Sequence, residues 1–289
     1  MPKEALELLR LPQGGVAVDG TLGLGGHAFL MAQALGPHGH LIGIDRDSAS
    51  LGLAQKKLAS LILKIDLLKG SFSTLDKFLA GLKVSAVDGI LLDLGISSFQ
   101  LDDGQRGFAF SHDGPLDMRM DIEAQGMSAA DLVNTLKQAE LEKIISEYGE
   151  ERFARRIAEA IVMQRSRAKI TTTKGLADII LRALPKGYTR GRIHPATRAF
   201  QALRIAVNEE LEALSLGLEV CFRALKKGGR LCVISFHSLE DRLVKNKFKS
   251  LGFEQEGVIL TKRPLVASDE ECKENPRARS AKMRGIEKA

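Results

Sequence analysis

The chain has 289 residues, of which 44% are hydrophobic and 27% are charged, and its formal net charge is +6. This length and apolar content suit one large domain or two smaller ones, and they exclude a disordered chain. No apolar run approaches the roughly 18 residues of a membrane span, and no signal-peptide core is present. We therefore expect a cytoplasmic protein that has no membrane partner.

The sequence has three cysteines, and no two of them are close together in the chain: Cys221, Cys232 and Cys272. The histidines are also scattered along the sequence. Cys221 and Cys232 fall in apolar helix and strand patterns. We expect reduced thiols, with neither a disulfide framework nor a bound metal.

The first predicted elements are a strand, a glycine turn and a helix. Residues 16–18 are apolar and end at Asp19, and a helix begins near His27. The turn between them contains Gly23, Gly25 and Gly26. Glycine allows sharp turns and the close approach of a ligand, and the free N–H groups of the helix point back at the turn. This arrangement predicts a site for a polar or anionic ligand.

The next apolar strand, residues 41–44, is followed by Asp45. Asp45 lies about 20 residues beyond the glycines, where nucleotide-binding βαβ units hold ribose hydroxyls. The spacing also fits a nicotinamide dinucleotide. Asp19, however, would repel a pyrophosphate and attract the ammonium and sulfonium groups of S-adenosylmethionine. The pattern favours S-adenosylmethionine; the alternatives are a nicotinamide cofactor and a tight loop without a ligand.

Two further strands are expected, one within residues 61–68 and one over residues 87–95. Phe72 follows the first of them, where it would cover an adenine ring or join the core. Asp93 ends the second. Ligands bind beyond the carboxyl ends of parallel strands, so we expect Asp19, Asp45, Phe72 and Asp93 to converge on one crevice.

The alternation of strands and helices then stops. A loop rich in Gly, Asp and Arg covers residues 102–121. This composition favours a loop that forms part of the binding site over a simple connector between domains. Helical patterns follow at residues 129–134, 138–147, 151–164 and 173–183. We predict an inserted helical domain, residues 102–198, within a discontinuous domain formed by residues 1–101 and 199–289.

Residues 152–198 carry a marked excess of positive charge. They contain twelve Lys and Arg residues, and their acids are Glu159 and Asp178. A solvated surface usually mixes the two signs, so this excess favours contact with RNA over a solubility face or an acidic protein partner. The RNA-binding residues that we expect are Arg155, Arg156, Arg165, Arg167, Lys169, Arg190 and Arg192.

A long helical pattern covers residues 199–225 and is expected to end at Gly228. We expect it to pack in the core, the alternative being a homodimer contact. A buried strand over residues 230–236 precedes His237, and a last strand is expected near residues 253–260. The charged tail, residues 262–289, is predicted to be a flexible end or an arm that orders on RNA.

Several of these segments together resemble the MraW family of ribosomal RNA small-subunit methyltransferases. They include DGTLGLGGH (19–27), LLDLGISSFQLDD (91–103), DGPLDMRMD (113–121), HPATRAFQALRIAVNEEL (194–211) and SFHSLEDR (235–242). The resemblance covers nearly the whole chain. It implies a Rossmann-like α/β methyltransferase sheet with an inserted, mostly helical substrate-recognition domain. It also implies S-adenosylmethionine-dependent N4-methylation of a cytidine in the decoding region of 16S ribosomal RNA, within the small ribosomal subunit.

The resemblance further implies cofactor contacts at Gly25, Gly26, His27, Asp45, Phe72, Asp93 and Gln100. Two features depart from the family pattern. Phe99 replaces the usual proline, and we expect it to change the loop that presents Gln100. The sequence also lacks a His-x-Pro-Val segment before its first helix. If that segment covers the cofactor or substrate, binding should be weaker, unless the true start codon lies upstream.

Methyl transfer to an exocyclic amine is an in-line displacement, so the protein mainly aligns the reacting atoms. The target base must also leave any stack. We hypothesise that Asp93 or Asp117 accepts the amine hydrogens, and that Ser97, Ser98 and His237 shape the base pocket. An RNA-binding assembly factor without catalysis is the main alternative. A nicotinamide oxidoreductase would need an acid–base constellation that the sequence does not offer.

Overall fold

The computed structural model describes residues 1–124, 126–185, 188 and 194–289. The chain divides into two compact units, one formed by Met1–Gly95 with Leu211–Ala289 and the other by Ile96–Glu210. The second unit therefore begins before the expected residue 102 and ends after the expected residue 198. Among the described residues, no helix is both long and apolar enough to cross a membrane.

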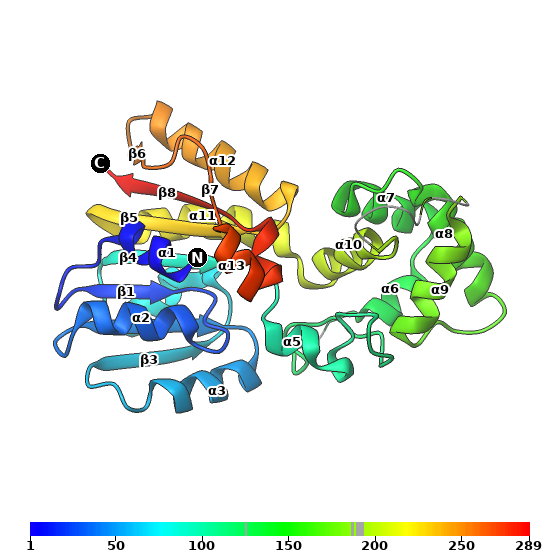
Figure 1. Ribbon diagram of the computed structural model, residues 1–289, viewed down its shortest axis with the longest axis horizontal. Coiled ribbons are helices and arrows are strands. Elements are labelled where there is room, and N and C mark those ends of the chain that lie inside the picture. Colours follow the sequence, from blue (N-terminus) through cyan, green and yellow to red (C-terminus); the bar gives the residue numbers. More distant parts are fainter. Residues whose placement is uncertain (125, 186–187, 189–193) are drawn as a thin grey trace. The chain divides into compact units, whose positions relative to one another are not determined.

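The first unit contains an eight-stranded sheet of order β3-β2-β1-β4-β5-β8-β6, with β7 paired to β8 off this path (Figure 1). Its strands are β1 (Val16–Asp19), β2 (His40–Asp45), β3 (Lys64–Lys69), β4 (Val87–Asp93), β5 (Leu225–Ser235), β6 (Gly257–Ile259), β7 (Leu265–Val266) and β8 (Lys282–Lys288). Strands β1 to β5 are parallel, and β8 is antiparallel to its neighbours. This topology confirms the predicted Rossmann-like α/β sheet.

Helices cover both faces of this sheet. One apolar cluster joins the sheet to α1 (Pro2–Leu9), α2 (Gly26–Leu35) and α3 (Ser48–Leu58). The other joins it to α4 (Leu75–Gly81), α11 (Glu210–Ala224) and α12 (Ser238–Phe253). Successive strand residues alternate between the two clusters: Leu91 packs in the first, and Leu92 in the second. Burial on both faces explains why the central strands β1, β2 and β4 are almost wholly apolar.

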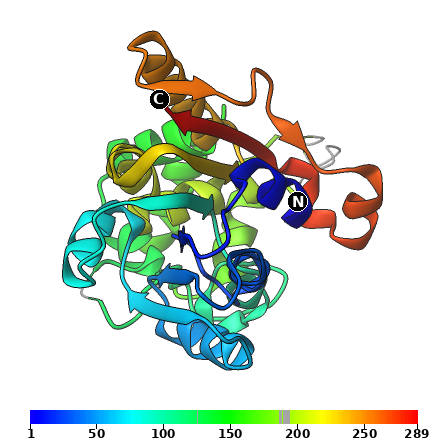
Figure 2. The same cartoon turned by 90° about the vertical axis from the view of Figure 1, so that its left-hand side faces the viewer.

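The prediction of a flexible or RNA-binding tail was wrong, because β8 lies between β5 and β6 in the sheet (Figure 2). The preceding residues form α13 (Asp269–Glu274) and a 3-10 helix (Pro276–Ser280). Met283 and Ile286 are fully buried. Arg284 is also buried, and its Nε donates to Asp241 Oδ1 at 2.7 Å. The buried charge of β8 is thus neutralised by a tertiary partner.

The expected single helix over residues 199–225 is two helices, α10 (Thr197–Asn208) and α11. Glu209 separates them in a left-handed conformation, with φ of 50°. The Asn208 side chain accepts from Met120 N at 2.7 Å and donates to Met118 O at 2.8 Å. The bend therefore brings Asn208 onto the loop around Met118. The second helix ends at Ala224, before Gly228, because β5 already begins at Leu225.

The second unit is helical and has its own apolar core. It contains α5 (Ser98–Asp102), α6 (Ala129–Thr135), α7 (Gln138–Gly149), α8 (Ala154–Arg165), α9 (Thr173–Ala183) and α10. The four helices predicted after the loop are confirmed. Two of them begin at side-chain caps: Ser128 forms a capping box with Asp131, and Thr172 accepts from Gly175 N. The core includes Leu132, Leu141, Ile157, Leu176 and Leu203.

Candidate functional site

Three aspartates end neighbouring parallel strands of the first unit. Asp19 ends β1, Asp45 ends β2 and Asp93 ends β4, and β1 lies between the other two strands. The three carboxylates therefore lie at one edge of the sheet, as the sequence predicted. Thr21, which the sequence did not single out, links two of these strand ends. Its N–H donates to Asp19 Oδ1 at 3.2 Å, and its hydroxyl accepts from Asp93 N at 2.6 Å.

The glycine turn follows β1 directly. Gly23 and Gly25 have φ of 50° and 73°, in the left-handed region that glycine adopts without strain. Gly25 is the N-cap of α2, which begins at Gly26. Because Gly25 has no side chain to accept from the first N–H groups of α2, these donors face the turn. The turn thus offers backbone donors to a ligand.

Asp45 holds this turn closed. Its Oδ2 accepts from Gly23 N at 2.7 Å, and its Oδ1 accepts from Asp47 N at 2.9 Å. Burial raises the pKa of Asp45 above its usual value. Each oxygen of a carboxylate can accept two hydrogen bonds, so Asp45 can also accept hydrogen bonds from the hydroxyl groups of a ligand. It therefore has a structural role and suits the predicted ribose contact.

Asp93 and His27 each leave a buried polar atom unsatisfied. Asp93 Oδ1 and His27 Nδ1 have no hydrogen-bond partner among the described residues. The His27 Nε2 atom lies 3.9 Å from Asp93 Oδ2. A buried polar atom without a partner is costly, so such atoms commonly mark a site where a ligand or water completes the bonding. Both residues were predicted to contact the cofactor.

Burial also changes the ionisation of this pair. It lowers the pKa of His27 to about 4, so the imidazole is neutral at pH 7. Burial, together with the charge of Glu240, raises the pKa of Asp93 to about 7. The Asp93 side chain is 36% exposed as a whole, so water partly screens its second oxygen. The pair therefore adds no positive charge at neutral pH.

Asp19 is the most deeply buried of the three carboxylates, with 1% exposure. Burial raises the pKa of Asp19 to about 7, and the charges of Asp93 and Asp45 act in the same direction. A cation bound at this edge would reverse that effect by favouring the ionised form. The site is therefore electrostatically suited to a cationic ligand.

A pH titration of stability tests the burial of Asp19. The pKa of this carboxyl is about 7 in the folded protein, whereas its ordinary value, which applies to the unfolded chain, is 3.8. The folded protein therefore holds the proton between pH 4 and 7, where the unfolded chain has lost it. We expect the free energy of unfolding to fall across this range, by up to about 4 kcal/mol from this group, and then to level off. The Asp19→Asn variant should lack this contribution. If plots of the free energy of unfolding against pH ran parallel for the two proteins, the burial of an ionisable Asp19 would not explain the pH dependence.

Phe72 packs in the core of the first unit. A Cβ atom at Gly217 of α11 would lie 2.3 Å from two Phe72 ring carbons, so the ring lies directly against this glycine. The Phe72 side chain is half-buried and belongs to the cluster that contains α11. This contact supports the core interpretation of Phe72. The adenine contact stays a prediction.

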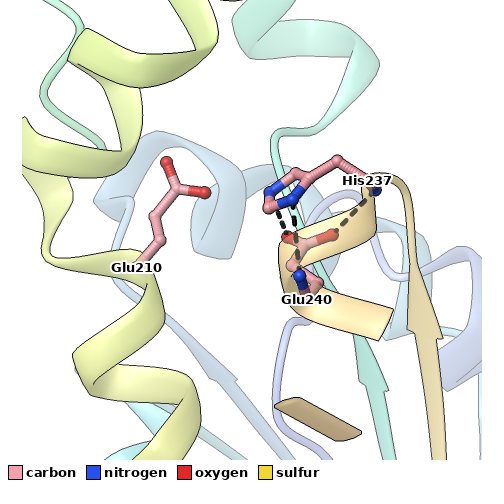
Figure 3. Close-up of side chains that lie close together, drawn as sticks. All are labelled: Glu210, His237 and Glu240. Carbon is pink, nitrogen blue, oxygen red and sulfur yellow. Dashed lines mark hydrogen bonds and ion pairs between the residues drawn. The ribbon is translucent and has the colours of Figure 1, made fainter. Parts of the chain in front are cut away.

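His237 and Glu240 lie at the end of β5, next to the end of β4 (Figure 3). His237 is the N-cap of α12, and Glu240 N donates to His237 Nδ1 at 3.4 Å. The Glu240 carboxylate accepts from Phe236 N at 2.8 Å. His237 Nε2 is buried and makes no hydrogen bond among the described residues, but it lies 3.3 Å from Glu240 Oε1. His237 thus starts a helix, and Glu240 engages its ring; its role in shaping a base pocket stays a prediction.

The predicted site residues Ser97 and Gln100 form a local structure in the second unit. Gln100 Oε1 accepts from Ser97 N at 3.0 Å, and Gln100 N donates to Ser97 Oγ at 3.2 Å. This capping box starts α5, whose first residue, Ser98, is exposed. Phe99 is accommodated within α5, so Gln100 is presented from a helix. The cofactor contact of Gln100 stays a prediction.

Asp117 is engaged by Arg119 of the same unit. Arg119 donates from Nε to Asp117 Oδ1 at 2.9 Å and from Nη2 to Asp117 Oδ2 at 2.7 Å. Partial burial alone would raise the pKa of Asp117, but the hydrogen bonds from Arg119 outweigh it, and the pKa is lowered. Asp117 is therefore ionised, and much of its acceptor capacity is used. Asp93, with an unsatisfied oxygen, is the better candidate for an acceptor of amine hydrogens.

The predicted RNA-binding residues fall into three groups. Arg155, Arg156, Arg167 and Lys169 are exposed on the second unit. Arg165 is half-buried, and its Nη1 donates to Val133 O at 2.8 Å, which ties α8 to α6. Arg190 and Arg192 lie outside the described residues. The exposed group keeps its predicted role, whereas Arg165 also has a structural one.

Comparison with known proteins gives a consistent result over the whole chain. The MraW methylase family matches residues 1–289. The ribosomal RNA small subunit methyltransferase H of Geobacter sulfurreducens is 52% identical over 303 residues, which cover 100% of this chain and 97% of that protein. The protein of the same name from Syntrophotalea carbinolica is 51% identical over 301 residues, which cover 99% and 96%.

Similarity to solved structures is more distant. The crystal structure of TrmN from Thermus thermophilus is 13% identical and aligns with a TM-score of 0.48, covering 100% of this chain and 48% of that chain. The family match and the sequence relatives extend across both units and include every strand end described above. This chain belongs to the MraW methylase family.

Proposed function

We propose that this protein transfers the methyl group of S-adenosylmethionine to the N4 amine of a cytidine in the decoding region of 16S ribosomal RNA. The observation that carries the proposal is the sheet edge at which Asp19, Asp45 and Asp93 meet the glycine turn, with Asp93 Oδ1 unsatisfied. Membership of a methylase family supports the reaction class. The names of the relatives, ribosomal RNA small subunit methyltransferases, support the substrate.

The residues at this edge suit the proposed cofactor. When bound, S-adenosylmethionine supplies a methyl group already activated on a positively charged sulfur. Its positive charge would favour the ionised forms of Asp19 and Asp93, whose pKa burial raises to about 7, while neutral His27 avoids repulsion. Asp45 has acceptor capacity for ribose hydroxyls. The pyrophosphate of a nicotinamide dinucleotide would instead be repelled by the same carboxylates.

The proposed task of Asp93 is to orient and deprotonate the amine. As the nitrogen–carbon bond forms and the sulfur–carbon bond breaks, the amine must lose one proton. A carboxyl with a pKa near 7 suits the acceptance of that proton at neutral pH. Asp117 is less suited, because Arg119 occupies its carboxylate.

Labelled methyl transfer to small ribosomal subunits that lack their own modification tests this function, with Asp45→Ala as the informative variant. The wild type should yield N4-methylcytidine at one site. The variant loses the acceptor for Gly23 and the proposed ribose contacts, so its S-adenosylmethionine Kd should rise on the order of 100-fold.

The matched control is Asp76→Ala, which removes an exposed aspartate of α4 and should leave the Kd unchanged. An unchanged Kd in Asp45→Ala would remove Asp45 from the cofactor site. Cofactor binding by the wild type without transfer to any ribosomal RNA would favour the alternative, an assembly factor that has lost catalysis.

The partner that we propose is the small ribosomal subunit, and the compartment is the cytoplasm, where bacterial ribosomes lie. The sequence-based reason for a homodimer was a long helix over residues 199–225. That helix is divided into α10 and α11, and each buries its apolar face in a core. This removes the reason for the homodimer contact, and the homodimer itself stays a prediction, which the molecular mass in solution tests.

A further inference from the structure

A pocket of about 240 Å³ lies on the second unit, between the end of α8 and one side of α9. Its wall includes Lys169, from the connection between the helices, and Arg182, from α9. Asp178 contributes a carboxylate to the same wall. The pocket therefore combines two cations with one acid, and its net charge is positive at neutral pH.

The two cations of the pocket are not neutralised by the protein. Within the described residues, neither Lys169 nor Arg182 lies within 4.0 Å of a carboxylate. Asp178 and Arg182 are four residues apart on α9, the spacing of helical ion pairs, yet they do not close one. Two other cations of this unit do form ion pairs: Arg119 binds Asp117, and Arg204 binds Glu210. Lys169 and Arg182 thus remain available to an anion from outside.

The backbone around the pocket is held in place before any ligand arrives. Leu116 N donates to Thr171 O at 2.9 Å, and Thr173 Oγ1 donates to His112 O at 3.0 Å. Thr172 caps α9 by accepting from Gly175 N at 3.1 Å. These bonds fix the connection between α8 and α9, so binding needs little ordering of the chain.

The surroundings suggest a ligand with repeated negative charges. Four more exposed cations lie nearby in the sequence, none of them within 4.0 Å of a carboxylate of the described residues: Arg155, Arg156, Arg167 and Lys174. A single small anion would need only the pocket. A phosphodiester chain presents a charge at every nucleotide, so it can contact the pocket and other exposed cations of this unit together.

We propose that this pocket binds a phosphodiester group of the RNA, with Lys169 and Arg182 as its cationic contacts. The identity of the polyanion rests on the proposed function, whereas the pocket and its charge do not. Contacts of this kind position an RNA without reading its sequence. Arg182 was not among the residues predicted from the sequence, because only the pocket shows that it faces the same space as Lys169.

Binding of deproteinised 16S ribosomal RNA, measured as a function of salt, tests the pocket in Lys169→Gln, Arg182→Gln and the double variant. Each phosphate contact contributes about 0.7 (single strands) to 0.9 (a DNA duplex) to the slope of log affinity against log salt. We expect each single variant to lower the slope by about 1 and to weaken binding on the order of fivefold near 0.1 M salt. The double variant should lower the slope by about 2.

Lys143→Gln is the matched control, because Lys143 is an exposed lysine on α7 of the same unit. Equal effects in Lys143→Gln, or an unchanged slope in the pocket variants, would overturn the proposal. Polyaspartate that competes as well as RNA for the wild type, but not for the double variant, would assign the pocket to an acidic protein instead.

Methyl transfer separates this proposal from the proposed function. The pocket variants should raise KM for the ribosomal subunit while kcat and S-adenosylmethionine affinity stay as in the wild type. If the wild type transfers no methyl group but binds RNA through Lys169 and Arg182, the pocket stands and the proposed function fails. If transfer is normal in every pocket variant at limiting RNA, the pocket proposal alone fails.

Discussion

Replacement of Asp93 by asparagine is expected to lower the rate of methyl transfer on the order of a thousandfold while the protein stays folded. Asparagine has nearly the same size, but it has no charge and presents an amide N–H₂ group where a carboxylate oxygen stood. Asp93 Oδ1 is buried and unsatisfied, so it is available to a ligand donor. Loss of a positioned proton acceptor typically costs 10²–10⁴-fold in rate.

Two readouts separate the possible roles of Asp93. S-adenosylmethionine Kd reports its contact with the cofactor, and single-turnover transfer at saturating cofactor reports its contact with the amine. Asp76→Asn, at an exposed position, is the control for loss of one charge. A raised Kd with a normal single-turnover rate would limit Asp93 to cofactor binding. If neither value changed, Asp93 would have no role in the site.

Asp93→Asn should also change stability in a way that a damaged fold would not. Burial raises the pKa of Asp93 to about 7, so its ionisation above that pH opposes folding in the absence of ligand. The variant without cofactor should therefore be at least as stable as the wild type at pH 8. A variant that melted at a much lower temperature would show that lost activity came from unfolding.

The sheet edge was predictable because each carboxylate directly follows its own strand. The apolar runs before Asp19, Asp45 and Asp93 predict strands, and the helical patterns between them require parallel connections. Thr21 was missed for a different reason. Its hydroxyl accepts from Asp93 N, which is 72 residues away, and this contact depends on the register between β1 and β4. A local pattern carries no information about that register.

The tail was misjudged because the charged residues of its last strand have tertiary partners. β8 is rich in charged residues, yet Arg284 is buried against Asp241, and Arg230 of β5 pairs with Glu287. Hydropathy alone counts such residues as exposed. A strand that pairs on both sides is stabilised chiefly by backbone hydrogen bonds and by a few buried residues such as Met283.

Two helices of the second unit, α6 and α9, were predicted well because their starts carry side-chain caps, Ser128 and Thr172. The break between α10 and α11 was not predicted. Glu209 ends α10 in a left-handed conformation that usually signals glycine or asparagine. The engagement of Asp117 by Arg119 was missed too. Met118 between them has φ of 63°, a conformation that no sequence pattern indicated.

Gly107→Ala is expected to destabilise the second unit by about 3 kcal/mol or more. Gly107 has φ of 71°, and a Cβ atom there would lie 2.2 Å from Pro115 O and 2.7 Å from Asp117 N. Both are backbone atoms, which cannot move aside by a change of rotamer. The main chain of the loop that carries Asp117 would have to shift.

That shift would also disrupt the bonds that hold the loop. Arg106, next to Gly107, accepts from Met118 N at 3.0 Å through its carbonyl and donates from Nη2 to Met120 O at 2.8 Å. We therefore expect a lower melting temperature for the second unit, with loss of methyl transfer. S-adenosylmethionine affinity, measured in the same samples, reports whether the damage extends to the cofactor site.

Gly104→Ala is the control from the same loop, because a Cβ atom at Gly104 would meet only His112 Cβ, at 3.4 Å, and its φ is not in the left-handed region. Its stability should lie within about 1 kcal/mol of the wild type. Equal melting temperatures for the two variants would mean that the loop adapts to a side chain at residue 107. In that case the Asp117–Arg119 pair would not depend on this turn, and the left-handed Met118 would be the remaining feature that fixes it.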